Sequence, residues 1–337
     1  SEFKLNLLSV FDYPNIDFVC LENPLKMSAT ELRSIIKVTA FATAQSEKKP
    51  VLTGVNFKHV DGKMVVTATD SFRLAEKVVN IENYNNFNII VPNKSLDELF
   101  KAIDTYDEEL ELYFSFNKLL VKFKNVLFQT RLLDGNFPDT SRLIPANFPI
   151  IIKFNKDELL EAVERVSLLS PRDKEKDREI TYSIIKLTIT KDRIIEISTN
   201  NAIIGDGKED IIPTDIQISN PIRIGFSSRY LIEALRSFNT EKISIHFVGD
   251  IKPILIKSDE DVLSIALFND VAIKFLQKRK EDEIVETINN QAEKISNSVT
   301  IYNDKDLIIM ALIMHDGLKK GLVEEKNTRY DHALLMS

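Results

Sequence analysis

Apolar positions recur at helical spacing in four segments of the chain. Residues 27–45 and 154–170 each indicate an amphipathic helix that begins after a polar capping region. Residues 93–103 and 228–238 show the same period. Other stretches alternate apolar and polar residues and are rich in β-branched and aromatic side chains, which is typical of strands. These stretches are 110–116, 119–133, 184–189 and 242–248.

The predicted helices belong to an internal repeat. Leu32 in the first helix aligns with Leu159, and Leu96 in the second aligns with Leu231. Between the helices, VVTATDSFRLAE aligns with IIEISTNNAIIGD so that Thr69 falls on Thr199. Matching segments in the same order predict two tandem copies of one α+β unit. In each copy we expect two helices on one face of an antiparallel sheet.

The repeat predicts how the chain divides into domains. Residues 11–15 echo residues 135–139, which end the first full copy. Residues 1–23 are therefore expected to be the remnant of an earlier copy. Two full copies are expected at 24–147 and 148–270, and a helical tail of uncertain nature at 271–337.

Composition and charge narrow the class of protein. The net charge is −7, which argues against a protein that binds nucleic acid through an overall positive charge. It does not exclude a protein that encloses a duplex with a locally positive inner wall. The single cysteine, Cys20, and the absence of a long apolar run favour a cytoplasmic protein. The sequence contains no phosphate-binding loop, zinc-spaced cysteine pairs or nucleophile elbow, so neither a cofactor nor an enzyme is expected.

Five ordered motifs resemble those of the bacterial DNA polymerase III β subunit family, the sliding clamps. They are KPVLTGVNF (49–57), TATDSFRLA (67–75), IIVPNKSLDEL (89–99), RLLDGNFPDTSRLIP (131–145) and IGFSSRYLIEALRS (224–237). The resemblance implies a fold with three copies of the α+β domain per subunit and a ring closed by two subunits. It also implies a non-catalytic subunit that encircles double-stranded DNA and gives the replicative polymerase its processivity.

The resemblance places the helices on the inner wall, facing DNA. Arg33 and Lys37 lie on one face of the first predicted helix, and the loop after it matches a DNA-touching loop of the family. Long cations on a rigid scaffold suit sequence-independent contact with phosphates. The expected DNA-facing residues are Arg33, Lys37, Gln45, Ser46, Lys48, Lys49, Lys94, Lys101, Arg165, Arg229 and Arg236.

The resemblance also implies an apolar pocket for short peptides of the polymerase, the clamp loader and repair proteins. Its expected lining is Leu52, Thr69, Ser71, Phe72, Arg73, Leu74 and Pro145. A plainer interpretation makes TATDSFRLA a strand and its turn, with Leu74 in the core and Asp70 bonding the turn amides. The family completes this pocket with a Pro-x-Arg signature, and that signature is missing from the corresponding stretch, 262–275.

Two alternatives to a complete clamp remain open. His315 and Asp316, with His332, resemble part of an HD-domain phosphohydrolase, in which such residues bind a divalent metal. The upstream histidine of that family is absent, so a helical appendage or a foreign fusion competes with this interpretation. The other alternative is a clamp-derived binding module that does not encircle DNA. Intact family members are homodimers, and with two full copies this polypeptide is not expected to close the usual ring.

Overall fold

The computed structural model describes most of the chain between residues 23 and 267. The described residues are 2–4, 6, 9, 18 and 23–267, without 83, 116, 142, 146, 171, 175–180, 190–193, 202–203, 219–220, 250–252 and 259–262. The chain divides into two compact units, residues 1–269 and 270–337, and every described residue belongs to the first. The predicted helical tail therefore lies outside the described residues, as does most of the expected remnant at 1–23.

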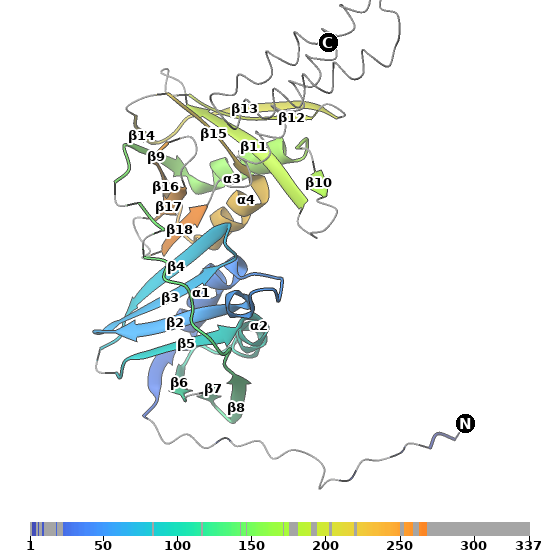
Figure 1. Ribbon diagram of the computed structural model, residues 1–337, viewed down its shortest axis with the longest axis vertical. Helices are drawn as coiled ribbons and strands as arrows, with labels where there is room; N and C mark the ends of the chain where they lie inside the picture. Colours follow the sequence, from blue (N-terminus) through green and yellow to red (C-terminus); the bar gives the residue numbers. More distant parts are fainter. Residues whose placement is uncertain are drawn as a thin grey trace, which may run out of the picture. The chain divides into compact units, whose positions relative to one another are not determined.

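Among its described residues, the first repeat contains two α-helices and eight strands, and Figure 1 shows their arrangement. In chain order its elements are β1 (Leu25–Ser28), α1 (Ala29–Thr39), the 3₁₀ turns η2 (Ala40–Ala42) and η3 (Pro50–Thr53), β2 (Gly54–Val60), β3 (Lys63–Thr69), β4 (Arg73–Asn80), β5 (Phe87–Pro92), α2 (Asn93–Ala102), β6 (Glu109–Phe114), β7 (Lys118–Phe123) and β8 (Val126–Arg131).

The second repeat follows the same order, with two additional short strands. Its elements are β9 (Ile150–Asn155), α3 (Lys156–Ser167), β10 (Arg172–Lys174), β11 (Thr181–Ile189), β12 (Ile195–Asn201), β13 (Gly205–Ile211), β14 (Asp215–Gln217), β15 (Ile222–Ser227), α4 (Ser228–Ser237), β16 (Lys242–Phe247), β17 (Ile254–Lys257) and β18 (Leu263–Leu267). The tandem α+β organisation predicted from the sequence is therefore confirmed.

Each repeat builds two antiparallel four-strand ladders of the same design. In the first repeat they are β1-β6-β7-β8 and β4-β3-β2-β5, and in the second β9-β16-β17-β18 and β13-β12-β11-β15. β18 pairs with β4 across the joint, with Ile265 opposite Ala75. One nine-stranded sheet therefore runs through both repeats, in the order β14-β9-β16-β17-β18-β4-β3-β2-β5.

Capping residues and apolar spacing explain where the first helix of each repeat forms. The Ser28 hydroxyl accepts a hydrogen bond from the Glu31 amide at 3.1 Å, and the Asn155 side chain accepts two at the start of α3. Behind each cap, apolar side chains at helical spacing are buried against the strands. They are Leu32, Ile35 and Ile36 in α1, and Leu159, Ala162 and Val163 in α3. A single core cluster includes residues of both repeats.

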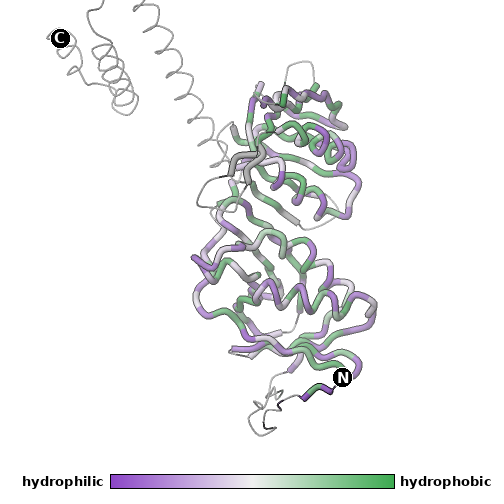
Figure 2. Tube along the Cα trace, turned by 90° about the vertical axis from the view of Figure 1, so that its right-hand side faces the viewer, coloured by the Kyte–Doolittle hydropathy of each residue, from purple (hydrophilic) through white to green (hydrophobic). Residues whose placement is uncertain are grey.

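Figure 2 shows hydrophobic and hydrophilic positions alternating along these elements, as expected of segments with one buried face. Among the described helices, none combines the length and the apolar character that a membrane crossing requires.

Three details of the sequence interpretation are wrong. The helix predicted over 27–45 ends at Thr39, whose hydroxyl donates to the Ile35 carbonyl oxygen at 2.7 Å, and a 3₁₀ turn follows. The strand predicted over 119–133 is the hairpin β7–β8, which turns at Lys124 with φ of 47°. Thr69 does not correspond to Thr199. Thr199 lies on the same face of its strand as the core residue Ile197, whereas Thr69 follows the core residue Ala68 directly and so lies on the opposite face of its strand.

Candidate functional site

The helical layer carries balanced charge. The four described helices contain eight Lys or Arg and eight Asp or Glu residues. Most of the cations that the sequence singles out are also held by acidic or carbonyl oxygens of the chain itself. The helices therefore do not form a strongly positive surface, and their individual contacts decide which cations can reach a ligand.

Arg33 ties α1 to the segment that follows α2. Its guanidinium donates to the carbonyl oxygens of Ile103 and Tyr106, and to the Asp107 carboxylate at 2.7 Å. Its side chain is only 17% exposed. Carbonyl groups near a helix C-terminus lack intrahelical partners, so this arginine satisfies acceptors that would otherwise need water. The contacts of Arg33 serve the fold.

Four other helix cations form ion pairs on the surface. Their partners are Glu98 for Lys101 at 2.8 Å, Glu209 for Arg165 at 2.5 Å, Glu233 for Arg229 at 2.9 Å and Glu164 for Arg236 at 2.7 Å. The hydrogen bonds that these side chains donate to their acidic partners raise the pKa of Lys101, Arg165 and Arg229. Exposed pairs of this kind are weak and readily exchange partners.

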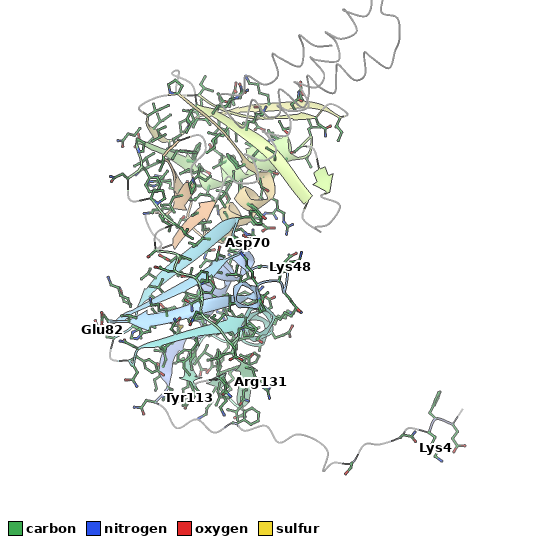
Figure 3. The ribbon with its side chains drawn as sticks, in the orientation of Figure 1. Lys4, Lys48, Asp70, Glu82, Tyr113 and Arg131 are labelled. Carbon is green, nitrogen blue, oxygen red and sulfur yellow. The ribbon has the colours of Figure 1, made fainter. Side chains whose placement is uncertain are left out.

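The loop between the 3₁₀ turns presents cations for which the described residues supply no such acidic partner. Gln45, Ser46, Lys48 and Lys49 are all exposed, and Figure 3 shows Lys48 on this loop. Within the described part of the chain, no ion pair involves Lys48, Lys49 or the exposed Lys94 of α2. Lys37 donates to the Asn239 side chain of the second repeat at 2.8 Å. These lysines can therefore approach an anion without first breaking an ion pair.

Asp70 organises the tight turn between β3 and β4. Its carboxylate accepts hydrogen bonds from the amides of Phe72 at 2.8 Å and Arg73 at 3.0 Å. Ser71 adopts a φ of 79°, a left-handed conformation that the turn requires. Burial raises the pKa of Asp70, although Arg73 and the turn amides oppose that rise. The structural role predicted for Asp70 is therefore confirmed.

Arg73 joins the two repeats. Its guanidinium donates to Asp70 at 3.1 Å, to the Phe41 carbonyl oxygen at 2.6 Å, and to Glu233 of α4. It also lies over the ring of Tyr230, 4.7 Å from the centroid. The Arg73 side chain is only 5% exposed, so its guanidinium is shielded from water. Arg73 acts here as an internal connection between repeats.

Leu74 lies on the opposite face of β4 and belongs to a second apolar cluster. The cluster contains Leu74, Leu255 and Ala266, with the partly buried Ile144 and Phe148 packed against them. It combines a strand of the first repeat, two strands of the second, and the segment that connects the repeats. We call these five residues the joint cluster.

Sequence reasoning identified Leu74 but missed the other four residues of the joint cluster. A signal for two of them was present. Residues 254–256 and 265–267 are unbroken apolar runs, which are typical of strands covered on both faces. Their inward positions fill the main core, while Leu255 and Ala266 face the joint cluster.

The remaining pocket candidates are dispersed around the β3–β4 turn. The Thr69 hydroxyl donates to the Arg73 carbonyl oxygen at 2.6 Å, and the Phe72 ring stacks on Tyr230. Leu52 is buried in η3, Ser71 is exposed and Pro145 is half-buried beside Ile144. Within the part of the chain that the structure describes, neither Leu52 nor Phe72 belongs to the joint cluster.

The metal-binding alternative lies outside this site. Among the residues that the structure describes, no three His, Cys, Asp or Glu side chains are grouped as metal ligands would be. His315, Asp316 and His332 lie outside the described residues, so the phosphohydrolase interpretation stays a prediction.

Comparisons with known proteins identify the family. The model for the central domain of the DNA polymerase III β subunit matches residues 26–139, and the model for its C-terminal domain matches residues 141–271. The beta sliding clamp of Staphylococcus epidermidis is 36% identical over 262 residues, which are 77% of this chain and 67% of that protein.

Solved structures agree with this assignment. The DNA polymerase sliding clamp of Bacillus subtilis is 34% identical with a TM-score of 0.71, over 77% of this chain and 67% of that one. The DNA polymerase β subunit of Streptococcus pyogenes is 31% identical with a TM-score of 0.71, over 77% and 69%. Two ordered domain matches and the repeated α+β fold lead to one assignment: this chain belongs to the DNA polymerase III β subunit family, the bacterial sliding clamps, which are accessory subunits and not catalytic ones.

Proposed function

We propose that this chain acts as a sliding clamp that holds duplex DNA against its helical layer and gives the replicative polymerase processivity. The observation that carries the proposal is the ordered match of both repeats to two successive domains of the sliding clamps. We further propose that it works in the cytoplasm and that, in an intact clamp, two subunits form the ring.

The charge arrangement supports loose, sequence-independent contact with DNA. A clamp must move along the duplex, so strong fixed contacts would hinder it. The proposed first contacts are Lys48, Lys49 and Lys94, which form no ion pair within the described residues, together with Lys37, which donates to the Asn239 side chain. Arg165, Arg229, Arg236 and Lys101 can join by exchanging a carboxylate for a phosphate, since surface ion pairs cost little to break. Arg33 connects α1 to the segment after α2 through its hydrogen bonds and so holds the helical layer together.

The joint cluster is the proposed site for partner peptides of the polymerase, the clamp loader and repair proteins. Its apolar side chains, with Thr69 and Ser71 nearby, fit capture of a short peptide through an apolar anchor. Ile144 and Phe148 are only partly buried, so they are the side chains that an incoming anchor would displace.

Topological trapping on DNA tests the proposed function. The protein is loaded by a clamp loader onto nicked circular plasmid, and the complex is separated from free protein in high salt. Encirclement by a closed ring is expected to give retention on the circle and loss after linearisation. Equal retention on linear DNA would identify a surface-binding module that does not encircle the duplex, and no retention on either would contradict the proposal.

A further inference from the structure

The joint cluster lies in one row of opposed residues that crosses the joint on a single face of the nine-stranded sheet (Figure 1). Leu74 on β4 is opposite Ala266 on β18, which is opposite Leu255 on β17. Leu255 is in turn opposite His246 on β16. Opposed residues of antiparallel strands point to the same face. The row therefore ends at His246, whose ring meets that of Phe148 at 80° with 5.3 Å between centroids.

The neighbouring row on the same face contains charged residues. Glu76 on β4 is opposite Ser264 on β18, which is opposite Lys257 on β17. Side chains alternate between the two faces along a strand, so Glu76 lies on the face of Leu74, and Lys257 lies on the face of Leu255. An acidic position in the first repeat and a basic position in the second therefore lie beside the apolar row.

Both charged side chains lose water without gaining a partner among the described residues. The two side chains are half-buried, and neither forms an ion pair within the part of the chain that the structure describes. Burial raises the pKa of the Glu76 carboxyl, and no hydrogen bond or charge of a described residue opposes that rise. A charge that is removed from water without compensation is costly. Each position therefore favours a ligand that brings the opposite charge.

The spacing of the two charged positions suits a short peptide. Neighbouring strands lie about 4.8 Å apart, so the backbones at Glu76 and Lys257, two strands apart, are separated by about 10 Å. In a polyproline-type segment, residues three positions apart point to the same side and lie about 9 Å apart. A pair of apolar residues between two charged ones would therefore lie beside the joint cluster, with a charge at each end.

We propose that Glu76 and Lys257 determine which peptides the joint cluster accepts and in which direction they bind. The favoured partner is a peptide whose apolar anchor has a cationic side chain on one side and an anionic side chain on the other. The cation pairs with Glu76 and the anion with Lys257. This inference rests on the proposed peptide site and adds to it the charge pattern of the partner.

Binding of three fluorescently labelled peptides to the full chain, measured by fluorescence polarisation, tests the charge pattern. Each peptide has the anchor Ile-Phe, which copies the side chains of Ile144 and Phe148 that it would displace. The flanking residues are Lys before and Glu after the anchor, the same two in reverse order, or Gln on both sides. Both ion pairs can form in only one direction of the peptide. We therefore expect one charged order to bind at least about threefold more tightly than the other.

Variants assign this preference to the two residues. Glu76→Gln and Lys257→Gln should each reduce the ratio of the two dissociation constants. Glu82→Gln removes an acid from an exposed position in the loop between β4 and β5, and as the control it should leave the ratio unchanged. The double variant Glu76→Lys, Lys257→Glu keeps the net charge and should reverse the favoured order.

The peptide with Gln on both sides separates failure of this inference from failure of the peptide site. If that peptide bound and the two charged orders bound equally, the inference would be overturned while the peptide site would stand. The inference would also be overturned if the double variant kept the original order, or if Glu82→Gln changed the ratio as much as Glu76→Gln. If none of the three peptides bound, the proposed peptide site would fail and the inference with it.

Discussion

Arg73 satisfies acceptors from three separate parts of the chain while it is almost completely buried. Asp70, Phe41 and Glu233 all accept hydrogen bonds from this guanidinium. Removing one partner of a buried ion pair leaves an uncompensated charge, which typically costs about 3–5 kcal/mol. We expect Arg73→Ala to lower the free energy of unfolding by about that amount in urea denaturation.

A nearby arginine provides the control for Arg73. Arg229 also binds Glu233, but its side chain is 41% exposed, so solvent screens the pair. Arg229→Ala should change the free energy of unfolding by about 1 kcal/mol or less. Equal losses for both variants would show that burial of Arg73 is not what makes its network strong.

Glu233 makes the same network dependent on pH. Its burial alone would raise the pKa, but hydrogen bonds and charge from Arg73 and Arg229 outweigh burial and lower it. A depressed folded-state pKa contributes stability that is present above the unfolded pKa and is lost as pH falls through the folded value. Glu233→Gln should therefore destabilise the protein at neutral pH, and its difference from wild type should shrink in acid. A difference that stays constant in denaturation curves from neutral pH to about pH 3 would contradict this assignment.

The sequence predicted the local part of this network but not its long-range part. Asp70 followed by Ser71 predicts a turn in which the carboxylate bonds the next amides, and those bonds form. Nothing in the local pattern pairs Arg73 with Glu233, which is 160 positions away. Their contact follows from strand β18 docking on β4, which is a tertiary event.

At the scale of elements, the two repeats start their first helices with different caps. Ser28 accepts one amide hydrogen bond and Asn155 accepts two. Loss of a helix cap typically costs about 1 kcal/mol. We expect Ser28→Ala and Asn155→Ala each to destabilise by about that amount, with the larger loss for Asn155→Ala. Thr30→Ala, at the second residue of α1, is the control for Ser28→Ala in chemical denaturation. If Thr30→Ala lowered the free energy of unfolding as much as Ser28→Ala does, the loss could not be assigned to the cap.

The elements that sequence patterns located well are those with unambiguous periodicity. All four α-helices form within the predicted ranges, because a buried stripe specifies a helix whatever packs against it. The end of α1 was misplaced since Ala40, Phe41 and Ala42 continue the apolar period after the helix has changed to a 3₁₀ turn. The β7–β8 turn was missed because it places Lys124, and not Gly or Asn, at positive φ.

At the scale of the whole molecule, the affinity for DNA should fall strongly as the salt concentration rises, although only a few lysine side chains contribute to this dependence. Lys48 and Lys49 are exposed and form no ion pair within the described residues. Each lost phosphate contact on B-form DNA reduces the slope of log K against log salt by about 0.9. The double variant Lys48→Gln, Lys49→Gln should therefore reduce the slope by about 2. The control variant Lys58→Gln, Lys63→Gln removes the same charge from exposed positions on β2 and β3, and it should leave the slope unchanged. If both double variants reduced the slope equally, the change would reflect net charge and not contact of Lys48 and Lys49 with DNA.

The nine-stranded sheet should also make the two repeats unfold together. Backbone pairing of β4 with β18, the Arg73 network and the joint cluster all cross the same boundary. A boundary this extensive favours one cooperative unfolding transition for both repeats. In such a transition the calorimetric enthalpy of unfolding equals the van't Hoff enthalpy.

Weakening the joint without weakening either core separates this cooperativity from general stability. Leu74→Ala removes fully buried side-chain atoms at the joint, and Leu112→Ala removes the same atoms from the core of the first repeat. Both should lower the unfolding temperature, since such deletions cost about 2–5 kcal/mol. Only Leu74→Ala should raise the ratio of calorimetric to van't Hoff enthalpy above one, because it alone lets the repeats unfold separately. Two transitions in the unmodified chain, or a raised ratio for Leu112→Ala, would show that the continuous sheet does not couple the repeats.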